Sequence, residues 1–302
     1  MSEIWVISET TSSILELIAH AKNFSQGEEI IAWSFTVEGA EQAAIHGADK
    51  VFQFQVMNRP EACVNVLVEK AKIHQPTAIL LGSTKRSKEI AARIAAALDT
   101  ALSTECIRIV KEDGISAERY IFGGLCIAKE TSQSSPFMAT MAPKTVEILQ
   151  ESPAVDTELI SGAEDSCRVI ELRKNQGTVN LSAADVVVCI GRGIAKQEDI
   201  EMVNRLAKAL RGKVGCTRPI AEDLHWMSEE SYIGISGQAV KPKLYIGLGV
   251  SGQIQHVAGI RDSKTIIAID KNENAPIVEA ADYALIGDVY EILPALLQKL
   301  NV

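Results

Sequence analysis

Short apolar runs alternate with amphipathic helical patterns along most of the chain, and this alternation restricts the possible folds more than any other feature of the sequence. In the first half, strand-like runs cover 4–7, 30–35, 50–55 and 78–81, and helical patterns cover 10–23, 38–46, 60–74 and 86–98. Within 86–98, Ile90, Ile94 and Leu98 recur at four-residue steps and form one apolar stripe. Strands that alternate with helices of this length predict a parallel sheet with helices on its faces.

The pattern changes after residue 100. Strand-like runs at 107–110, 118–122 and 145–149, with the turn signal Asp113-Gly114 between the first two, predict an antiparallel extension of the first sheet. The polar stretch 151–180, which holds a short strand-like piece at 168–172, predicts the boundary between domains 1–165 and 166–302. Two domains also suit a chain of 302 residues, because single hydrophobic cores stop growing at about 250–300 residues.

The second domain repeats the α/β pattern. Strands are expected at 185–190, 213–215, 244–250, 265–269 and 283–286, and helices at 198–210 and 289–300. Pro294 is expected either in the first turn of the last helix or at a kink within it. The predicted fold class is therefore α/β, with two domains built on parallel sheets.

Charge and composition exclude several classes of function. The net charge is −9 and basic residues form no run, so neither nucleic acid nor an anionic membrane surface is expected as the main partner. The N-terminus lacks the basic region of a signal peptide, and no apolar run reaches the roughly 18 residues of a transmembrane segment. The six cysteines show neither CxxC spacing nor a metal-binding cluster, which predicts reduced thiols and a cytoplasmic location.

Glycines and polar groups follow the predicted strands of the second domain. The run LYIGLGVSGQIQHVAG, residues 244–259, passes from a buried strand into hydroxyl, amide and imidazole side chains. GRG follows the strand at 185–190, CTRP follows 213–215, and YIGISGQAV precedes 244. Ligands of open α/β sheets lie beyond the carboxyl ends of the strands. The sequence therefore predicts a site there for an anionic ligand with a large polar planar part.

Each of these residues also has a purely structural explanation. Gly191 and Gly193 are half of a dinucleotide-binding fingerprint whose third glycine is absent, so they predict either a phosphate-binding turn or a simple tight turn. Arg218 could instead form a surface ion pair, and His256 could be a hydrogen-bonded core histidine. Asp270, which follows the strand at 265–269, could cap a turn.

The stretch LYIGLGVSGQIQHVAGIRDSKTIIAID, residues 244–270, resembles the signature of the electron-transfer flavoprotein alpha subunit. The resemblance extends through GRG at 191–193, GCTRP at 215–219 and APIVEAADYALIGD at 275–288. GCTRPIAED and HWM further resemble the branch whose subunits serve quinone-linked or acyl-CoA-linked flavoprotein systems in bacteria. The resemblance implies a first domain like the adenine-nucleotide hydrolases, acting as a docking platform, and a Rossmann-like second domain that binds FAD.

The resemblance also implies where the FAD lies. Ser251 to His256 would wrap the pyrophosphate and one edge of the ring, with His256 near the C2 carbonyl. Arg218 would lie against the isoalloxazine and Ser236 near N5. A fixed guanidinium and a histidine donor would stabilise the negative charge of a reduced flavin. The other residues that the resemblance places in the site are Arg192, Thr217, Ile233, Gly234, Ile235, Gly252, Gln253, Ile254, Gln255, Asp270, Asp288 and Val289.

Two positions depart from the family pattern. Ile235-Ser236 stands where many members have Gln-Thr, so one side-chain amide near the ring is missing. Asp270 stands in place of the usual Asn. A carboxylate accepts hydrogen bonds but cannot donate them, which changes the contacts available to the adenosine end.

The function expected from the resemblance is that of an electron carrier, with no catalytic acid, base or nucleophile of its own. Its expected partners are a beta subunit that completes a heterodimer and a donor of the acyl-CoA dehydrogenase type, as in fatty acid β-oxidation. Two alternatives stay open. An NAD-dependent dehydrogenase would need a complete GxGxxG, whereas the first strand is followed by SETTSS and the later motif reads GRGIAK. A nucleotide-binding module without redox function would differ by the absence of flavin absorbance.

Overall fold

The computed structural model describes residues 2–55, 59–161, 167, 169–171, 181 and 183–301. Two compact units make up the chain, Met1–Leu172 and Arg173–Val302. The division between them lies seven residues after the predicted boundary at 165 and inside the polar stretch 151–180. Of the expected strand at 168–172, both end residues lie outside the described part of the chain, and residues 169–171 are not in a strand.

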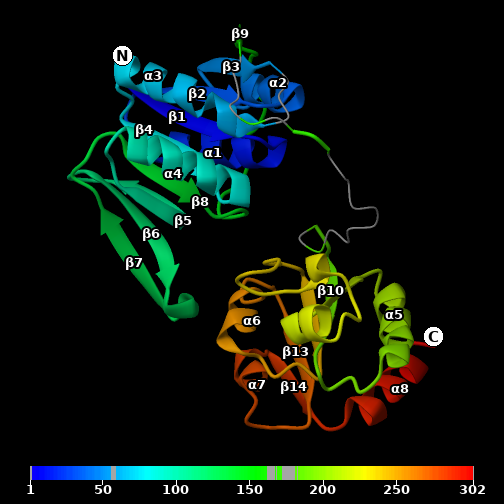
Figure 1. Ribbon diagram of the computed structural model, residues 1–302. Coiled ribbons are helices and arrows are strands. Elements are labelled where there is room, and N and C mark those ends of the chain that lie inside the picture. The colour runs from blue at the N-terminus through cyan, green and yellow to red at the C-terminus, as the bar shows by residue number, and fades with distance from the viewer. Residues whose placement is uncertain are drawn as a thin grey trace. The chain divides into compact units, whose positions relative to one another are not determined.

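The first unit is built on a nine-stranded sheet of order β7-β6-β5-β8-β4-β1-β2-β3-β9 (Figure 1). Its parallel part consists of β1 (Glu3–Ser8), β2 (Glu29–Ser34), β3 (Lys50–Phe54), β4 (Ala78–Gly82), β8 (Phe137–Met141) and β9 (Thr157–Ile160). The connecting helices are α1 (Thr11–Phe24), α2 (Val37–Ile45), α3 (Val64–His74), which follows a 3₁₀ turn at Pro60–Cys63, and α4 (Lys85–Ala97).

Local chemistry explains where three of these helices begin. Thr10, Thr36 and Thr84 precede α1, α2 and α4, and each side chain accepts a hydrogen bond from a backbone N–H in the first turn. Alternate strand residues then face opposite helices, because successive side chains of a strand point to opposite faces. Ile4 and Val6 pack with α1 and α2, whereas Trp5 and Ile7 pack with α3 and α4.

The predicted antiparallel extension is confirmed, and two of its three predicted strands, at 107–110 and 118–122, overlap strands of the structure. It consists of β5 (Leu102–Lys111), β6 (Ile115–Ile121) and β7 (Cys126–Thr131), and β5 joins the main sheet by pairing in parallel with β8. The predicted strand at 145–149 is wrong. Lys144 has a left-handed φ of 57°, and the Thr145 hydroxyl donates to the carbonyl of Ala142, so the chain turns here instead of extending. β7, β8 and β9 were not predicted.

The second unit is a five-stranded, wholly parallel sheet of order β11-β10-β12-β13-β14. Its strands are β10 (Val186–Ile190), β11 (Lys213–Cys216), β12 (Leu244–Leu248), β13 (Ile266–Asp270) and β14 (Tyr283–Ile286). One face packs against α5 (Ile200–Ala209) and α8 (Val289–Lys299), and the other packs partly against α7 (Pro276–Ala280). Pro294 lies inside α8, beyond its first turn. The predicted α/β class with two parallel sheets is confirmed.

The order of strands in the second unit decides where a ligand can bind. From β10 the chain passes to β11 on one side and then returns to β12 on the other side of β10. The loops that leave the carboxyl ends of β10 and β12 therefore diverge, and such a switch point is the usual binding crevice of an open α/β sheet. Among the helices of the described residues, none combines the length and apolarity needed to cross a membrane.

Candidate functional site

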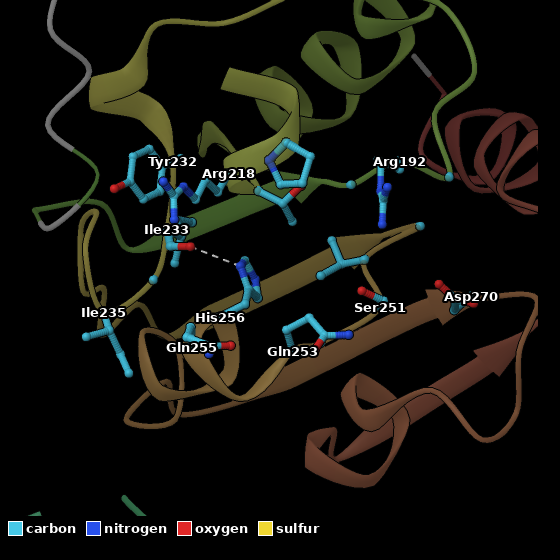
Figure 2. A pocket seen from close by; sticks show the side chains of 18 of the residues that line it. Arg192, Arg218, Tyr232, Ile233, Ile235, Ser251, Gln253, Gln255, His256 and Asp270 are labelled. Atoms are coloured by element: carbon cyan, nitrogen blue, oxygen red, sulfur yellow. Dashed lines mark hydrogen bonds between the residues drawn. The ribbon is translucent and has the colours of Figure 1, made fainter. Parts of the chain in front are cut away.

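A cavity of about 510 Å³ lies at the carboxyl ends of β10 to β13, at the switch point of the second sheet (Figure 2). Its size is within the range of about 300–1,000 Å³ that is usual for cofactor sites. The residues that line it are Gly191, Arg192, Gly193, Thr217, Arg218, Pro219, Tyr232, Ile233, Gly234, Ile235, Ser236, Gly249, Val250, Ser251, Gly252, Gln253, Gln255, His256 and Asp270.

Glycines allow two loops of the cavity wall to touch backbone to backbone. The N–H of Gly193 donates to the carbonyl of Gly249 at 3.0 Å, and a Cβ on Gly191 would lie 2.2 Å from that same carbonyl oxygen. Gly252 has a φ of +75°, and a Cβ there would lie 2.3 Å from the amide nitrogen of Ile277. The GRG motif is therefore required for close contact between the loops after β10 and β12.

Arg218 lies on the opposite wall and is half of an ion pair. It precedes a π-helical turn, Pro219–Asp223, and its Nε lies 2.5 Å from Oε2 of Glu222. The hydrogen bond to Glu222 raises the pKa of the Arg218 guanidinium. Because 66% of its side chain is exposed, the guanidinium can still reach a ligand. Arg218 therefore forms the ion pair that the sequence left open, and it also lines the cavity, while its contact with a ligand stays a prediction.

His256 is a buried, hydrogen-bonded histidine that also lines the cavity. Its Nδ1 lies 3.0 Å from the carbonyl oxygen of Ile233, as the dashed line in Figure 2 marks, and its Nε2 lies 2.7 Å from the hydroxyl of Tyr245. Burial lowers the pKa of His256 to about 4, so the ring is neutral at pH 7. Burial also raises the pKa of Tyr245 well above its usual value, which keeps its hydroxyl protonated.

The remaining wall is held by backbone bonds and by a turn. The N–H of Ile235 donates to the carbonyl of Gln255 at 3.0 Å, while the Ile235 side chain stays 61% exposed beside the cavity. Asp270 accepts a hydrogen bond from the N–H of Asn272 at 2.9 Å through Oδ1. It therefore caps a turn and lines the cavity at the same time.

Thirteen of the sixteen residues predicted for the site line this cavity. In the described part of the chain, three lie elsewhere: Ile254, Asp288 and Val289. Ile254 is 56% exposed on the short helix α6 (Ile254–Ala258), and Val289 is buried in the core of α8. Asp288 caps α8 through the N–H of Tyr290 and pairs with Lys271 at 2.9 Å. Their contact with a ligand stays a prediction.

Sequence reasoning missed Tyr232 in the cavity wall and Tyr245 behind it. Tyr245 is fully buried on β12, and its hydroxyl needs a partner there. The sequence contained one indication of this partner, because a tyrosine inside a buried strand predicts a polar group nearby. His256, eleven residues later, is that group.

Comparison with protein families covers both units. Residues 4–165 match the electron transfer flavoprotein domain, and residues 180–261 match the electron transfer flavoprotein FAD-binding domain. The second match contains every cavity-lining residue except Asp270.

Relatives align over nearly the whole chain. YdiR of Escherichia coli strain K12, whose name classes it with electron transfer flavoprotein subunits, is 35% identical over 310 residues, covering 100% of this chain and 99% of YdiR. FixB of Salmonella typhimurium strain LT2 is 33% identical over 307 residues, covering 98% of this chain and 97% of FixB. FixB of Escherichia coli O127:H6 shows the same identity and coverage.

Proposed function

The chain belongs to the electron transfer flavoprotein alpha family, and on this basis we propose that it is the FAD-carrying subunit of a heterodimer that passes electrons from a flavin dehydrogenase to a later acceptor. The observation that carries the proposal is the glycine-lined cavity inside the FAD-binding domain. The second subunit is a beta subunit, and the donor is of the acyl-CoA dehydrogenase type, which would place the protein in fatty acid β-oxidation.

The residues around the cavity fit FAD. The glycines at 191, 193, 249 and 252 let the loops around the cavity approach one another backbone to backbone, and the backbone N–H groups of such loops suit a pyrophosphate. Arg192 and Arg218 supply positive charge for a ligand that is anionic at its phosphates and again when its ring is reduced. Ile233 and Val250 add apolar surface for a planar ring.

In this proposal, each wall of the cavity binds a different part of FAD. Ser251, Gly252 and Gln253 bind the pyrophosphate, and Arg218 and Ser236 approach the ring. Asp270 accepts hydrogen bonds from the adenosine end. Bound FAD supplies the redox chemistry, because it exchanges electrons one or two at a time. The chain itself binds, orients and adjusts the electrostatic surroundings of the ring, and the proposal assigns it no catalytic residue.

The first domain is proposed as a platform for partner subunits instead of a nucleotide site. The carboxylate of Glu9, directly after β1, accepts hydrogen bonds from the hydroxyls of Thr84, which caps α4, and Ser87 in the first turn of α4. An internal carboxylate therefore lies at a helix N-terminus where a nucleotide phosphate would otherwise bind. This contact supports a domain that has lost nucleotide chemistry.

The test is to co-express the chain with a beta subunit encoded beside it and to count flavins. We expect a heterodimer that absorbs at about 450 nm and releases FAD on denaturation, with one FAD assigned to this chain. The reduced acyl-CoA dehydrogenase should then bleach that absorbance. A colourless complex that binds NAD or another nucleotide would contradict the proposal, and a flavin-loaded complex that the dehydrogenase cannot reduce would reject that donor.

A further inference from the structure

His256 is hydrogen-bonded through both of its ring nitrogens, to Ile233 in the facing wall of the cavity and to Tyr245 behind the cavity. Neutral imidazole carries one N–H donor and one bare acceptor nitrogen. The carbonyl of Ile233 can only accept, so Nδ1 carries the proton; Nε2 must then accept from the hydroxyl of Tyr245. Both hydrogen-bonding positions of the ring are therefore used within the chain.

The two walls are in close contact at this point. Besides the bond from Ile235 to Gln255, the N–H of Val240 donates to the carbonyl of Gly259 at 2.8 Å. A Cβ on Gly259 would lie 2.9 Å from the Cα of Gly234. The imidazole is a side-chain connection between the segment around Ile233 and helix α6, and residues of both segments line the cavity.

Tyr245 holds this connection from outside the cavity. It is fully buried on β12 and packs in the core between the sheet and the cavity walls. Its ring lies 6.1 Å from that of His256, and the thiol of Cys189 lies 4.0 Å from Nε2. The groups facing the imidazole are thus a phenol, a thiol and a carbonyl, none of which is charged at pH 7.

We infer that Tyr245 is a positioning residue of the FAD site: its hydroxyl fixes His256 as the neutral Nδ1–H tautomer and thereby sets the spacing of the two walls that hold the flavin. The inference rests on the proposed function and extends it. Among the cavity-lining residues, Arg192 and Arg218 carry positive charge, whereas the neutral His256 contributes shape.

The first test needs no flavin. The full chain with ¹⁵N-labelled histidine is examined by NMR at pH 6, and His256 is assigned through its contacts with the Tyr245 ring. We expect a neutral ring with the proton on Nδ1. Tyr245→Phe should move the Nε2 resonance toward that of an unbonded imidazole nitrogen. Tyr290→Phe is the matched control, because it also removes hydrogen bonds of a phenol, to Asp199 and Ala195, yet should leave His256 unchanged.

The second test measures FAD. Tyr245→Phe should weaken FAD binding about three- to tenfold, the effect of one lost hydrogen bond, and should shift the flavin visible spectrum. An Nε2 proton in the unmutated chain, or an Nε2 resonance that Tyr245→Phe does not move, would overturn the inference. So would a moved resonance with unchanged FAD affinity and spectrum. If no variant binds FAD at all, the proposed function fails, while the histidine measurement still decides how Tyr245 and His256 interact.

Discussion

Both sheets contain parallel strands joined through helices, but the residues at the carboxyl ends of those strands differ in chemistry. In the first domain, side chains at the strand ends bond to one another, as Glu9 does with Thr84 and Ser87. In the second domain, glycines at the strand ends bring backbone to backbone and leave a cavity of about 510 Å³. The α/β pattern therefore does not itself create a binding site. The residues placed at the strand ends decide whether the edge is filled or open.

Glycine has a different purpose at each edge. A Cβ on Gly82, at the end of β4, would lie 2.4 Å from the Oγ of Ser13, which is a side-chain atom. A Cβ on Gly191 would lie 2.2 Å from the carbonyl oxygen of Gly249, which the backbone holds in place. A serine can change rotamer, whereas a strand-end carbonyl cannot move without the loop. The second edge should therefore tolerate substitution less well.

The largest expected effect tests this difference directly. Gly191→Ala should destabilise the protein by about 3 kcal/mol and abolish FAD binding, because the clash is with backbone. Gly82→Ala should cost about 1 kcal/mol and leave FAD binding intact. Chemical denaturation and flavin content of both variants are the measurements. Equal losses of stability and flavin would show that the two edges do not differ in this way.

Acid should destabilise both domains through one buried histidine each. Burial lowers the pKa of His20 and of His256 to about 4, from about 6.5 in the unfolded chain. Between pH 6.5 and pH 4 each histidine is protonated in the unfolded state but neutral in the folded state. The contribution of each neutral histidine to the free energy of unfolding is therefore fully present above pH 6.5 and is lost as the pH falls toward 4. At pH 5 each histidine should account for about 2 kcal/mol of the loss.

Denaturant unfolding at pH 7.5 and pH 5 checks this expectation. His20→Gln and His256→Gln should each reduce the difference between the two pH values, and the double variant should reduce it further. The exposed His74, which pairs with Glu3, provides the control His74→Gln. If the two buried variants lose as much stability on acidification as the unmutated chain, then the buried histidines are not the cause.

Arg218→Ala should lower the potential of the bound flavin by about 60 mV, the equivalent of a tenfold change for one electron. The guanidinium favours the negative charge of a reduced ring. Glu222→Gln should act in the opposite direction and by less, because it removes the carboxylate that pairs with Arg218. Arg86 is the matched residue of the first domain, paired with Glu61 at 2.8 Å, and Arg86→Ala should leave the potential unchanged. A redox titration of the heterodimer measures the flavin potential of all three variants. A change in potential caused by Arg86→Ala alone would contradict the placement of Arg218 at the flavin ring.

The smallest effect is expected at Asp270. Asp270→Asn keeps an acceptor for the N–H of Asn272, gains a donor and removes a charge, so FAD affinity should change about fivefold without a change in the visible spectrum. Tighter binding would mean that the Asp270 carboxylate had repelled the phosphates of FAD. Weaker binding would mean that the carboxylate accepts a hydrogen bond from the ribose. Glu9→Gln, at the filled edge of the first domain, should leave FAD affinity unaltered. Fluorescence titration at two salt concentrations separates these outcomes, and an Asp270→Asn affinity unchanged at both would leave only the turn-capping role.

Sequence reasoning worked best where a structural signal is local. Strand and helix periods identified most elements, and the site residues implied by the family resemblance include thirteen of the nineteen cavity-lining residues. It failed for β7 and β9, whose residues are mostly exposed and so lack a clear apolar face, and for β8, whose five buried residues resemble any short apolar run. The false strand at 145–149 shows the same limit, since Lys144 and Thr145 turn the chain through backbone and hydroxyl geometry.

The sequence by itself determined the α/β class, the two sheets, the glycines and polar residues after each strand, and the family that they indicate. Only the tertiary structure decided what those residues do together. It showed that GRG serves contact with the loop of Gly249, that Glu9 fills the first edge, and that His256 gives both nitrogens to Ile233 and Tyr245. The physical reason is the distance along the chain over which each effect acts. Periodicity and turn chemistry act between residues a few positions apart, whereas the state of a buried group depends on partners that only the folded chain brings into contact.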